Sequence, residues 1–342
     1  MKIPFIKLPT PDLNYFNLLI QDSIAAGHYS NFGPNEQALT NHFATLIGHP
    51  IVCCANATLA LDGLHDLIHK INPSWTKAAL PGFTFPATNI GCRISFEYAP
   101  TSNDKETYGY ALFDNIEADY AITTAPFGSP RPLTYYRPNV KLWIVDNAAG
   151  ATPQMEQVRD WLLAGADAVV VSLHATKSLS ACEGGFVAFA NKELYDAYKK
   201  YINFGFYIEK EEKKIASFGG SNHKMSELSA SWARMSLDRI FTLDHERRVE
   251  IAKQYQLFCE KRQIDYIYST QAFWICCPSS AAEISKNLLA LGLETKPYYT
   301  PLYGEIEDLT TIKLSTNGLC LPTWAMSDAE LDFTIQILEK CL

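Results

Sequence analysis

The sequence predicts an α/β protein: a large domain with a mostly parallel sheet flanked by helices, and a smaller C-terminal α/β domain. Short apolar runs typical of strands alternate with segments whose apolar residues recur every three to four positions, as on one face of a helix. The strand-like runs are apolar on both faces, as in parallel sheets covered by helices on both sides. The chain has 342 residues, which suits two domains. We predict a large domain at residues 1–240 and a small domain at 241–342.

The strands of the large sheet are expected early in the chain, at residues 51–55, 78–80, 94–98, 120–124, 140–145 and 168–172. A helix follows the first strand, because Leu61, Leu64, Leu67 and Ile68 recur at helical spacing. A long helix near 225–260 joins the two domains. In the small domain we expect a strand at 271–277 and helices at 281–291 and 328–342.

Composition and charge exclude several classes of protein. The net charge of −8 disfavours a nucleic-acid binder held by broad basic patches. The nine cysteines lack the C-x-x-C spacing of metal and redox sites, and their odd number fits reduced, buried thiols. Neither a signal peptide nor an apolar run of the ~18–20 residues of a membrane helix is evident. We therefore expect a cytoplasmic protein with no bound metal and no membrane contact.

Lys177 and Asp146 are the main candidates for catalysis. Lys177 follows the apolar run 168–171, and burial at a strand end lowers the pKa of an amine and favours its nucleophilic form. Asp146 ends the expected strand Trp143-Ile-Val-Asp146, where a carboxylate needs a partner such as a pyridinium nitrogen. Each also has an ordinary interpretation: a solvated surface lysine, and a helix-capping or turn aspartate.

Other strand ends carry groups suited to binding a cofactor. Asn56-Ala57-Thr58 opens a helix, so its backbone N–H groups and the Thr58 hydroxyl suit a phosphate, although an N-cap alone explains them too. Ser172 could add a second hydroxyl. Phe85 offers a ring able to stack on a flat heterocycle, or else packs in the core. His174 is an accessory candidate only.

Motifs for other common chemistries are absent from the sequence. No G-x-G-x-x-G or Walker A motif supports a nicotinamide or ATP site. No G-x-S-x-G elbow supports serine hydrolase chemistry.

Taken together, the motifs resemble those of the DegT/StrS sugar aminotransferases, fold-type I enzymes that use pyridoxal phosphate (PLP). The most specific match is Ser172-Leu-His-Ala-Thr-Lys177 followed by Glu183-Gly-Gly185. Ser30-Asn-Phe-Gly-Pro34 is similar to the family's N-terminal motif, and Pro81-Gly-Phe-Thr-Phe-Pro-Ala-Thr88 to its Thr-aromatic-x-Ala-Thr segment. Gly220-Ser-Asn-His-Lys-Met-Ser-Glu227 resembles Gly-x-Asn-x-Arg-Met-Ser-Glu. The resemblance covers nearly the whole chain.

The resemblance implies a role for each candidate. Lys177 would form a Schiff base with PLP, and Asp146 would pair with the pyridinium nitrogen. Phe85 would stack on the ring, and the phosphate would be held by Ala57, Thr58, Ser172 and, from a neighbouring subunit, Asn222. Tyr298, Tyr299 and Tyr303 are candidates for the substrate side, with packing between domains as an equal alternative.

The implied reaction moves an amine from L-glutamate to a nucleotide-linked keto-6-deoxyhexose, most often a dTDP-4-keto sugar. It would take place in a cytoplasmic homodimer and serve deoxy amino sugar biosynthesis, for example for O-antigen lipopolysaccharide. Two rival interpretations are a PLP-dependent dehydratase or lyase, and a regulatory protein that keeps the fold without turnover.

Ala149 departs from the family pattern. Relatives usually place Gln, sometimes His, three residues after the Asp, where it contacts the ring hydroxyl of PLP. Here that hydroxyl would need another donor, for which Asn147, His174 or water are candidates.

Overall fold

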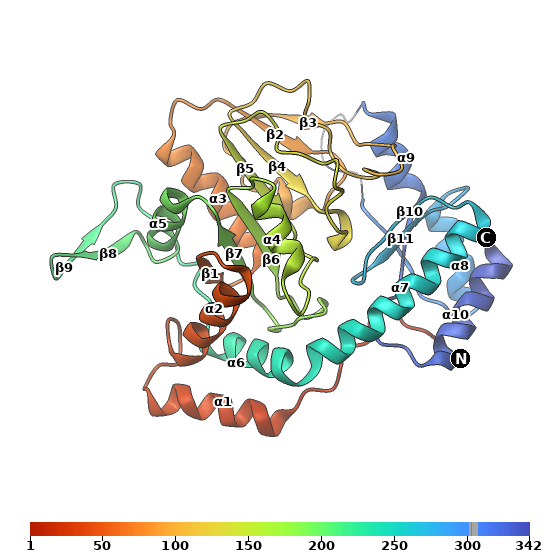
Figure 1. Ribbon diagram of the computed structural model, residues 1–342, viewed down its shortest axis with the longest axis horizontal. Coiled ribbons are helices and arrows are strands. Elements are labelled where there is room, and N and C mark those ends of the chain that lie inside the picture. Colours follow the sequence, from red (N-terminus) through yellow and green to blue (C-terminus); the bar gives the residue numbers. More distant parts are fainter. Residues whose placement is uncertain (301, 303–306) are drawn as a thin grey trace.

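The computed structural model describes residues 1–300, 302 and 307–342 (Figure 1). Its centre is a seven-stranded sheet in the order β1-β7-β6-β5-β4-β2-β3. The strands are β1 (Ile51–Cys54), β2 (Lys77–Pro81), β3 (Ser95–Ala99), β4 (Tyr120–Thr124), β5 (Leu142–Asp146), β6 (Ala168–Ser172) and β7 (Gly185–Phe189). β7 runs antiparallel to both of its neighbours, whereas the strands from β6 to β3 are parallel. The prediction of a mostly parallel sheet is confirmed.

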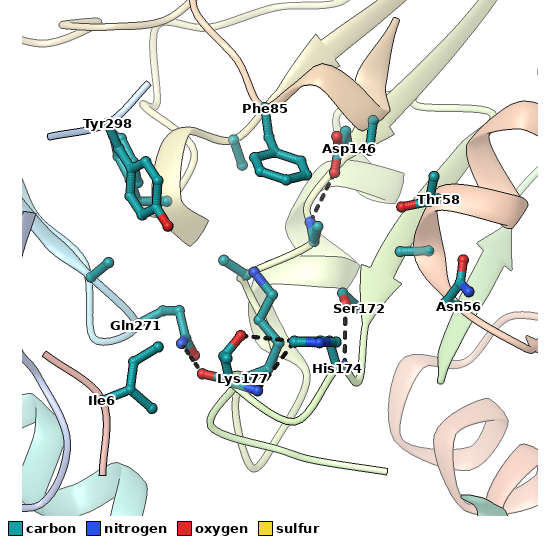
Figure 2. Close-up of a pocket in the computed structure, with 18 of the residues that line it drawn as sticks. Ile6, Asn56, Thr58, Phe85, Asp146, Ser172, His174, Lys177, Gln271 and Tyr298 are labelled. Atoms are coloured by element: carbon teal, nitrogen blue, oxygen red, sulfur yellow. Dashed lines mark hydrogen bonds between the residues drawn. The ribbon is translucent and has the colours of Figure 1, made fainter. Parts of the chain in front are cut away.

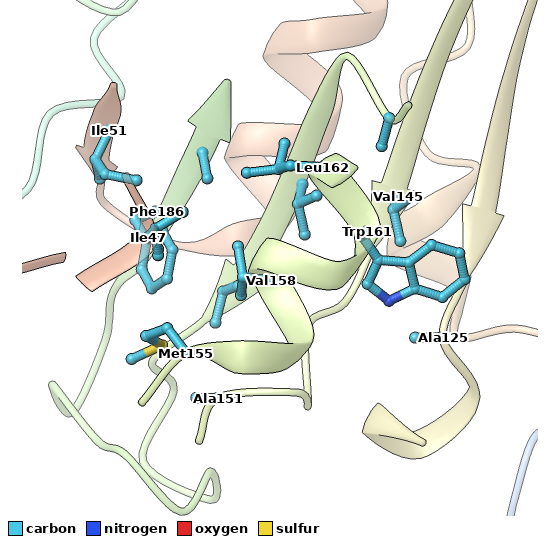
Figure 3. Close-up of a cluster of buried hydrophobic side chains, with 14 of the residues drawn as sticks. Ile47, Ile51, Ala125, Val145, Ala151, Met155, Val158, Trp161, Leu162 and Phe186 are labelled. Atoms are coloured by element: carbon cyan, nitrogen blue, oxygen red, sulfur yellow. The ribbon is translucent and has the colours of Figure 1, made fainter. Parts of the chain in front are cut away.

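Helices cover both faces of this sheet. On one face lie α2 (Pro34–Ile47), α4 (Glu156–Leu163) and α6 (Glu227–Ser236), and on the other lie α3 (Ala57–Ile71) and α5 (Lys192–Tyr201). Side chains of β6 alternate between two cores. Val169 and Val171 belong to the core that includes the α4 residues Val158 and Trp161, part of which Figure 3 shows, and Val170 belongs to the core that includes α3. This alternation explains why the strands are apolar on both faces. α1 (Leu13–Ala25) packs outside, against α2 and α6.

A long helical segment leads to the C-terminal part of the chain. α6 continues through a π-helical turn (Leu237–Phe241) into α7 (Thr242–Arg262). The predicted long helix near 225–260 is thus confirmed. The predicted boundary at 240/241 falls within this segment and stays a prediction.

A second, four-stranded sheet of order β10-β11-β13-β12 follows α7. Its strands are β10 (Tyr266–Ile267), β11 (Phe273–Cys276), β12 (Lys296–Pro297) and β13 (Gly318–Leu321), and its helices are α8 (Ala281–Ala290), α9 (Leu309–Asn317) and α10 (Asp328–Cys341). We call residues 242–342 the C-terminal unit. Ile3 lies in its core, so the N-terminal segment packs on this unit rather than on the large sheet.

The remaining elements are short. Pro86–Thr88 and Pro126–Gly128 form 3₁₀ turns at strand ends, and β8 (Phe206–Glu209) pairs with β9 (Glu212–Ile215) in a hairpin that projects from the body in Figure 1. Among the helices of the described residues, none has the length and apolar character needed to cross a bilayer.

Candidate active site

A cavity of about 780 Å³ lies between the ends of the large-sheet strands and the C-terminal unit. The residues predicted for the site line it, apart from Asn222 and from Tyr303, which lies outside the described residues. They are Ala57, Thr58, Phe85, Asp146, Ser172, His174, Lys177, Tyr298 and Tyr299. Figure 2 shows Asp146, Ser172, Phe85 and Tyr298 around the side chain of Lys177. Parallel strands bring their carboxyl ends to one edge, and this edge collects residues far apart in the sequence.

Lys177 lies in the turn that follows β6, and its amine points into the cavity (Figure 2). Its backbone N–H donates to the His174 carbonyl at 2.8 Å, so the segment turns here instead of extending. This turn brings His174 and Lys177 to the same cavity. Burial lowers the pKa of the Lys177 amine, and the negative charge of Asp146 opposes that shift only in part. The amine is therefore prepared to act as a nucleophile or base.

Asp146 is buried at the end of β5, with 4% of its surface exposed. Thr88 Oγ1 donates to its Oδ2 at 2.6 Å, and the Ala148 N–H donates to its Oδ1 at 3.1 Å. Burial raises the pKa of Asp146, and these two donors and Lys177 counteract the rise. A buried carboxylate with so few donors suits a cationic ligand group.

A chain of hydroxyl groups extends behind Asp146. Thr84 Oγ1 lies 2.6 Å from Thr88 Oγ1 on one side and 2.6 Å from Thr124 Oγ1 on the other. Because Thr88 gives its single hydroxyl hydrogen to the carboxylate, Thr84 must donate to Thr88, and Thr124 to Thr84. All three dipoles then point toward Asp146 and stabilise its charged form.

The N-terminus of α3 forms the anion-binding end of the cavity. Asn56 is the N-cap, and its Oδ1 accepts the Leu59 N–H at 2.8 Å. The first N–H groups of the helix, at Ala57 and Thr58, have no intrahelical acceptor and are available to a phosphate. Gly185 permits this placement: a Cβ there would lie 2.8 Å from the Ala57 nitrogen and 2.9 Å from the Val171 oxygen.

Ser172 and Phe85 complete the part of the cavity formed by the ends of the large-sheet strands. Ser172 Oγ accepts the His174 N–H at 3.3 Å, which leaves its own hydrogen for a ligand. Phe85 is 55% exposed and lines the cavity, so it is not a core residue. The His174 ring lies 2.9 Å from Thr176 Oγ1 and 3.4 Å from Glu183.

Gln271 is a residue of this site that the sequence did not indicate. It comes from the C-terminal unit, and its side-chain amide holds the peptide groups on both sides of Lys177. Its Oε1 accepts the Ser178 N–H at 2.7 Å, and its Nε2 donates to the Thr176 carbonyl at 2.7 Å. Both bonds are made to backbone atoms, which carry no signal of their own in the sequence. Gln271 thus joins the lysine turn to the C-terminal unit.

The two tyrosines of the cavity differ in their contacts. Tyr299 is buried, stacks on Phe127 at 4.4 Å between ring centroids, and accepts the Phe127 N–H at 3.2 Å. These contacts favour packing between the two parts of the chain. Tyr298 is partly exposed and faces the cavity in Figure 2, which leaves it available to a substrate.

Glu227 explains two of the motifs without touching the cavity. Its carboxylate, 1% exposed, accepts the N–H groups of Asn35 and Glu36 at 2.9 Å each and so caps the N-terminus of α2. A Cβ on Gly33 would lie 2.6 Å from Glu227 Cδ, so glycine is required there. Glu227 and Gly33, one from each of these two motifs, therefore serve folding through this contact.

Comparison with known proteins identifies the family. The model of the DegT/DnrJ/EryC1/StrS aminotransferase family matches residues 134–333, more than half of the 342-residue chain. The chain belongs to this family.

Individual relatives agree with this membership. The Mycobacterium tuberculosis protein MT3510 is 24% identical over 328 residues, which cover 88% of this chain and 77% of that protein. A dTDP-4-amino-4,6-dideoxy-D-glucose transaminase of Shigella dysenteriae is 38% identical over 76 residues, 22% of this chain and 20% of that enzyme. The crystal structure of DesI in the presence of its TDP-sugar product has a TM-score of 0.81 and 22% identity, covering 99% of this chain and 92% of that one. The chain thus has the fold-type I architecture.

The cofactor of this aminotransferase is pyridoxal 5′-phosphate. The cavity fits it: a buried carboxylate suits the pyridinium nitrogen, the free N–H groups of α3 suit the phosphate, and a lysine amine with a lowered pKa suits the aldehyde. The exposed Phe85 ring is available for stacking.

Two positions singled out by the resemblance are Ala149, which departs from the family pattern, and Asn222, which matches it. Asn147 is fully buried and is not among the residues that line the cavity, and neither polar atom of its side chain has a partner among the described residues. Among the candidate residues, His174 does line it. Asn222 is exposed, accepts from Lys224 Nζ at 2.6 Å, and does not line the cavity of its own chain. Its role toward a neighbouring subunit stays a prediction.

Proposed function

We propose that the protein transfers the amino group of L-glutamate to a nucleotide-linked keto-6-deoxyhexose, in the first place a dTDP-4-keto-6-deoxyhexose. The observation that carries this proposal is the meeting of Lys177, Asp146 and the N-terminus of α3 in one cavity of about 780 Å³. This volume lies within the range of pockets for drug-sized ligands. The TDP-sugar product of DesI and the dTDP-linked product of the Shigella transaminase support a nucleotide-sugar substrate.

Each residue has a defined task in this reaction. PLP, when bound, supplies an electron sink for negative charge on the carbon that bears the amine. Asp146 keeps a proton on the ring nitrogen, helped by the hydroxyl chain from Thr124. The Lys177 amine removes the proton from the α-carbon of the amino donor and in the second half-reaction returns a proton to the sugar carbon. Ala57, Thr58 and Ser172 bind the phosphate, and Phe85 fixes the plane of the ring.

The proposal includes a homodimer in which Asn222 of one subunit reaches the phosphate bound by the other. The exposure of Asn222 outside its own cavity supports this arrangement. It also includes a cytoplasmic location, supported by nine cysteines that are all unpaired.

Two experiments test the proposal. The purified protein should absorb in the visible range, lose this absorbance with borohydride, and carry the reduced label on Lys177. A screen of nucleotide-linked keto-sugars with glutamate, read by mass spectrometry, should yield an amino sugar. A protein that takes up no PLP would refute the proposal, and a product without added nitrogen would indicate a lyase or dehydratase instead.

A further inference from the structure

Arg248 is a buried cation in the same cavity, remote in sequence from every motif above. It lies on α7, exposes 5% of its surface and lines the cavity. Its Nε donates to Asp244, one turn earlier on the helix. We infer that Arg248 and Thr323 form a binding site for an oxyanion of the substrates, a carboxylate or a phosphate. The inference rests on the proposed function, whose two substrates both carry such groups.

The hydrogen bonds of Arg248 are incomplete. A guanidinium has five N–H donors, and the bond to Asp244 uses the one on Nε. The two terminal nitrogens have no acceptor among the described residues. Since Arg248 lines the cavity, these donors are open to a ligand there that supplies acceptors.

Thr323 supplies an independent sign of a ligand. It is 1% exposed and lines the same cavity, and its hydroxyl has no hydrogen-bond partner among the residues that the structure describes. Its segment is fastened to α7 on both sides: Tyr255 Oη donates to the Pro322 carbonyl at 2.9 Å, and Arg247 Nε donates to the Met326 carbonyl at 2.6 Å. These bonds hold Thr323 along the helix that carries Arg248.

The chemistry of the pair favours an oxyanion. Asp244 fixes the plane of the guanidinium through Nε and leaves the terminal nitrogens as a fork, the geometry that binds carboxylate and phosphate groups with two hydrogen bonds. The Thr323 hydroxyl adds a third donor. The other lysines and arginines that line the cavity are Lys177 and Lys7. Lys177 is engaged in the chemistry. The side chain of Lys7 is 57% exposed, and its Nζ lies 3.6 Å from Glu330 Oε1, so Lys7 is not a buried cation like Arg248.

Equilibrium binding to the cofactor-loaded protein tests this site without turnover. Glutarate serves as a dicarboxylate that lacks an amine, and dTDP as the phosphate probe, both measured by calorimetry. Arg248→Gln should weaken one of them roughly tenfold to a hundredfold, and Arg248→Lys less, because it keeps the charge but loses the fork. Arg262→Gln is the matched control: Arg262 lies on the same helix, but its guanidinium bonds to the Glu339 carbonyl and it does not line the cavity, so the affinities of this variant should stay within about twofold of the wild type.

A second variant guards against a folding defect. Arg248→Gln leaves the Asp244 carboxylate buried without its cation, which destabilises the protein. The double variant Asp244→Asn/Arg248→Gln removes both charges and should show the same loss of affinity.

The outcomes separate the two sources of the anion. Weaker glutarate binding alone assigns the site to the amino donor, and weaker dTDP binding alone assigns it to the nucleotide. If the wild type, Arg248→Gln and the double variant bind each probe with equal affinity, the inference is overturned. It is also overturned if the wild type binds neither probe. Product formation by the wild type is measured separately, so failure of the proposed transamination is distinguishable from failure of this site.

Discussion

The two walls of the cavity are built in different ways. The strand-end wall, made by Asn56–Thr58, Asp146, Ser172 and Lys177, follows β1, β5 and β6 of the large sheet. The C-terminal wall, made by Gln271, Tyr298, Tyr299, Thr323 and Trp324, comes from loops beside the small sheet. On the strand-end wall, Asp146 belongs to a buried network of side chains, the hydroxyl chain through Thr88, Thr84 and Thr124. On the C-terminal wall, side chains bond mainly to backbone atoms across the gap.

The difference suggests a division of roles: the strand-end wall carries out the chemistry, and the C-terminal wall recognises the substrates. The ends of buried strands are held by both cores of the large sheet, so they fix the groups that act on the cofactor. The C-terminal wall meets the other through single side chains such as Gln271 and Tyr299. We therefore expect substitutions on the strand-end wall to abolish the chemistry, and those on the C-terminal wall to tune it.

The largest effect is expected for Lys177→Ala. Loss of both the nucleophile and the base should lower kcat roughly 1,000-fold or more, while PLP still binds without a covalent bond. Steady-state kinetics and mass spectrometry after borohydride check this. Lys192→Ala, at an exposed lysine paired with Asp196 on α5, is the control and should keep wild-type activity. Full activity of Lys177→Ala would refute the role of the strand-end wall.

The same lysine predicts a dependence on pH. Burial lowers the pKa of Lys177, whereas the hydrogen bond to Asp196 raises the pKa of Lys192. A lowered pKa means that the neutral amine is present at lower pH. Reductive methylation of the cofactor-free protein should therefore modify Lys177 at a lower pH than Lys192, as followed by peptide mass spectrometry. The opposite order would show that the Lys177 amine is solvated.

Gly185→Ala should weaken cofactor binding by roughly tenfold or more. The new Cβ would press on the Ala57 nitrogen at 2.8 Å and displace the N–H groups that bind the phosphate. Fluorescence titration of the cofactor-free protein with PLP measures this. Gly184→Ala is matched, because its Cβ would meet Ala181 Cβ at 2.8 Å and Met225 Cε at 2.9 Å, away from α3. Equal affinities in the two variants would show that strain at the Gly184-Gly185 pair, and not the position of α3, controls binding.

A smaller effect, about tenfold on kcat, is expected for Gln271→Met. It removes both hydrogen bonds that flank Lys177 while keeping the length of the side chain. Gln271→Glu keeps an acceptor for Ser178 but loses the donor to Thr176, and its charge should raise the pKa of Lys177. Methylation of Lys177 should then require a higher pH in the Glu variant than in the Met variant. An unchanged kcat in both variants would show that the hydrogen bonds from Gln271 do not contribute to the activity of Lys177.

The sequence predicted one wall much better than the other. Asp146 and Ser172 were found because each ends an apolar run, and Lys177 because it follows one closely; parallel strands bring such ends together. β7 was missed because the pattern of an isolated strand contains no sign that it inserts antiparallel between β1 and β6. Gln271 was missed because its partners are backbone atoms of a distant segment, and Arg248 because only the assembled fold shows that it lines the cavity.

The smallest effect is expected for Tyr299→Phe. The change keeps the ring stacked on Phe127 but leaves the buried Phe127 N–H without its acceptor, at a cost of about 1–2 kcal/mol in the free energy of unfolding. Urea denaturation measures this cost, and kcat should stay within about twofold of the wild type. Tyr299→Leu also loses the stacking and should be less stable still. A large loss of kcat in Tyr299→Phe with unchanged stability would instead place its hydroxyl among the groups that contact the substrate.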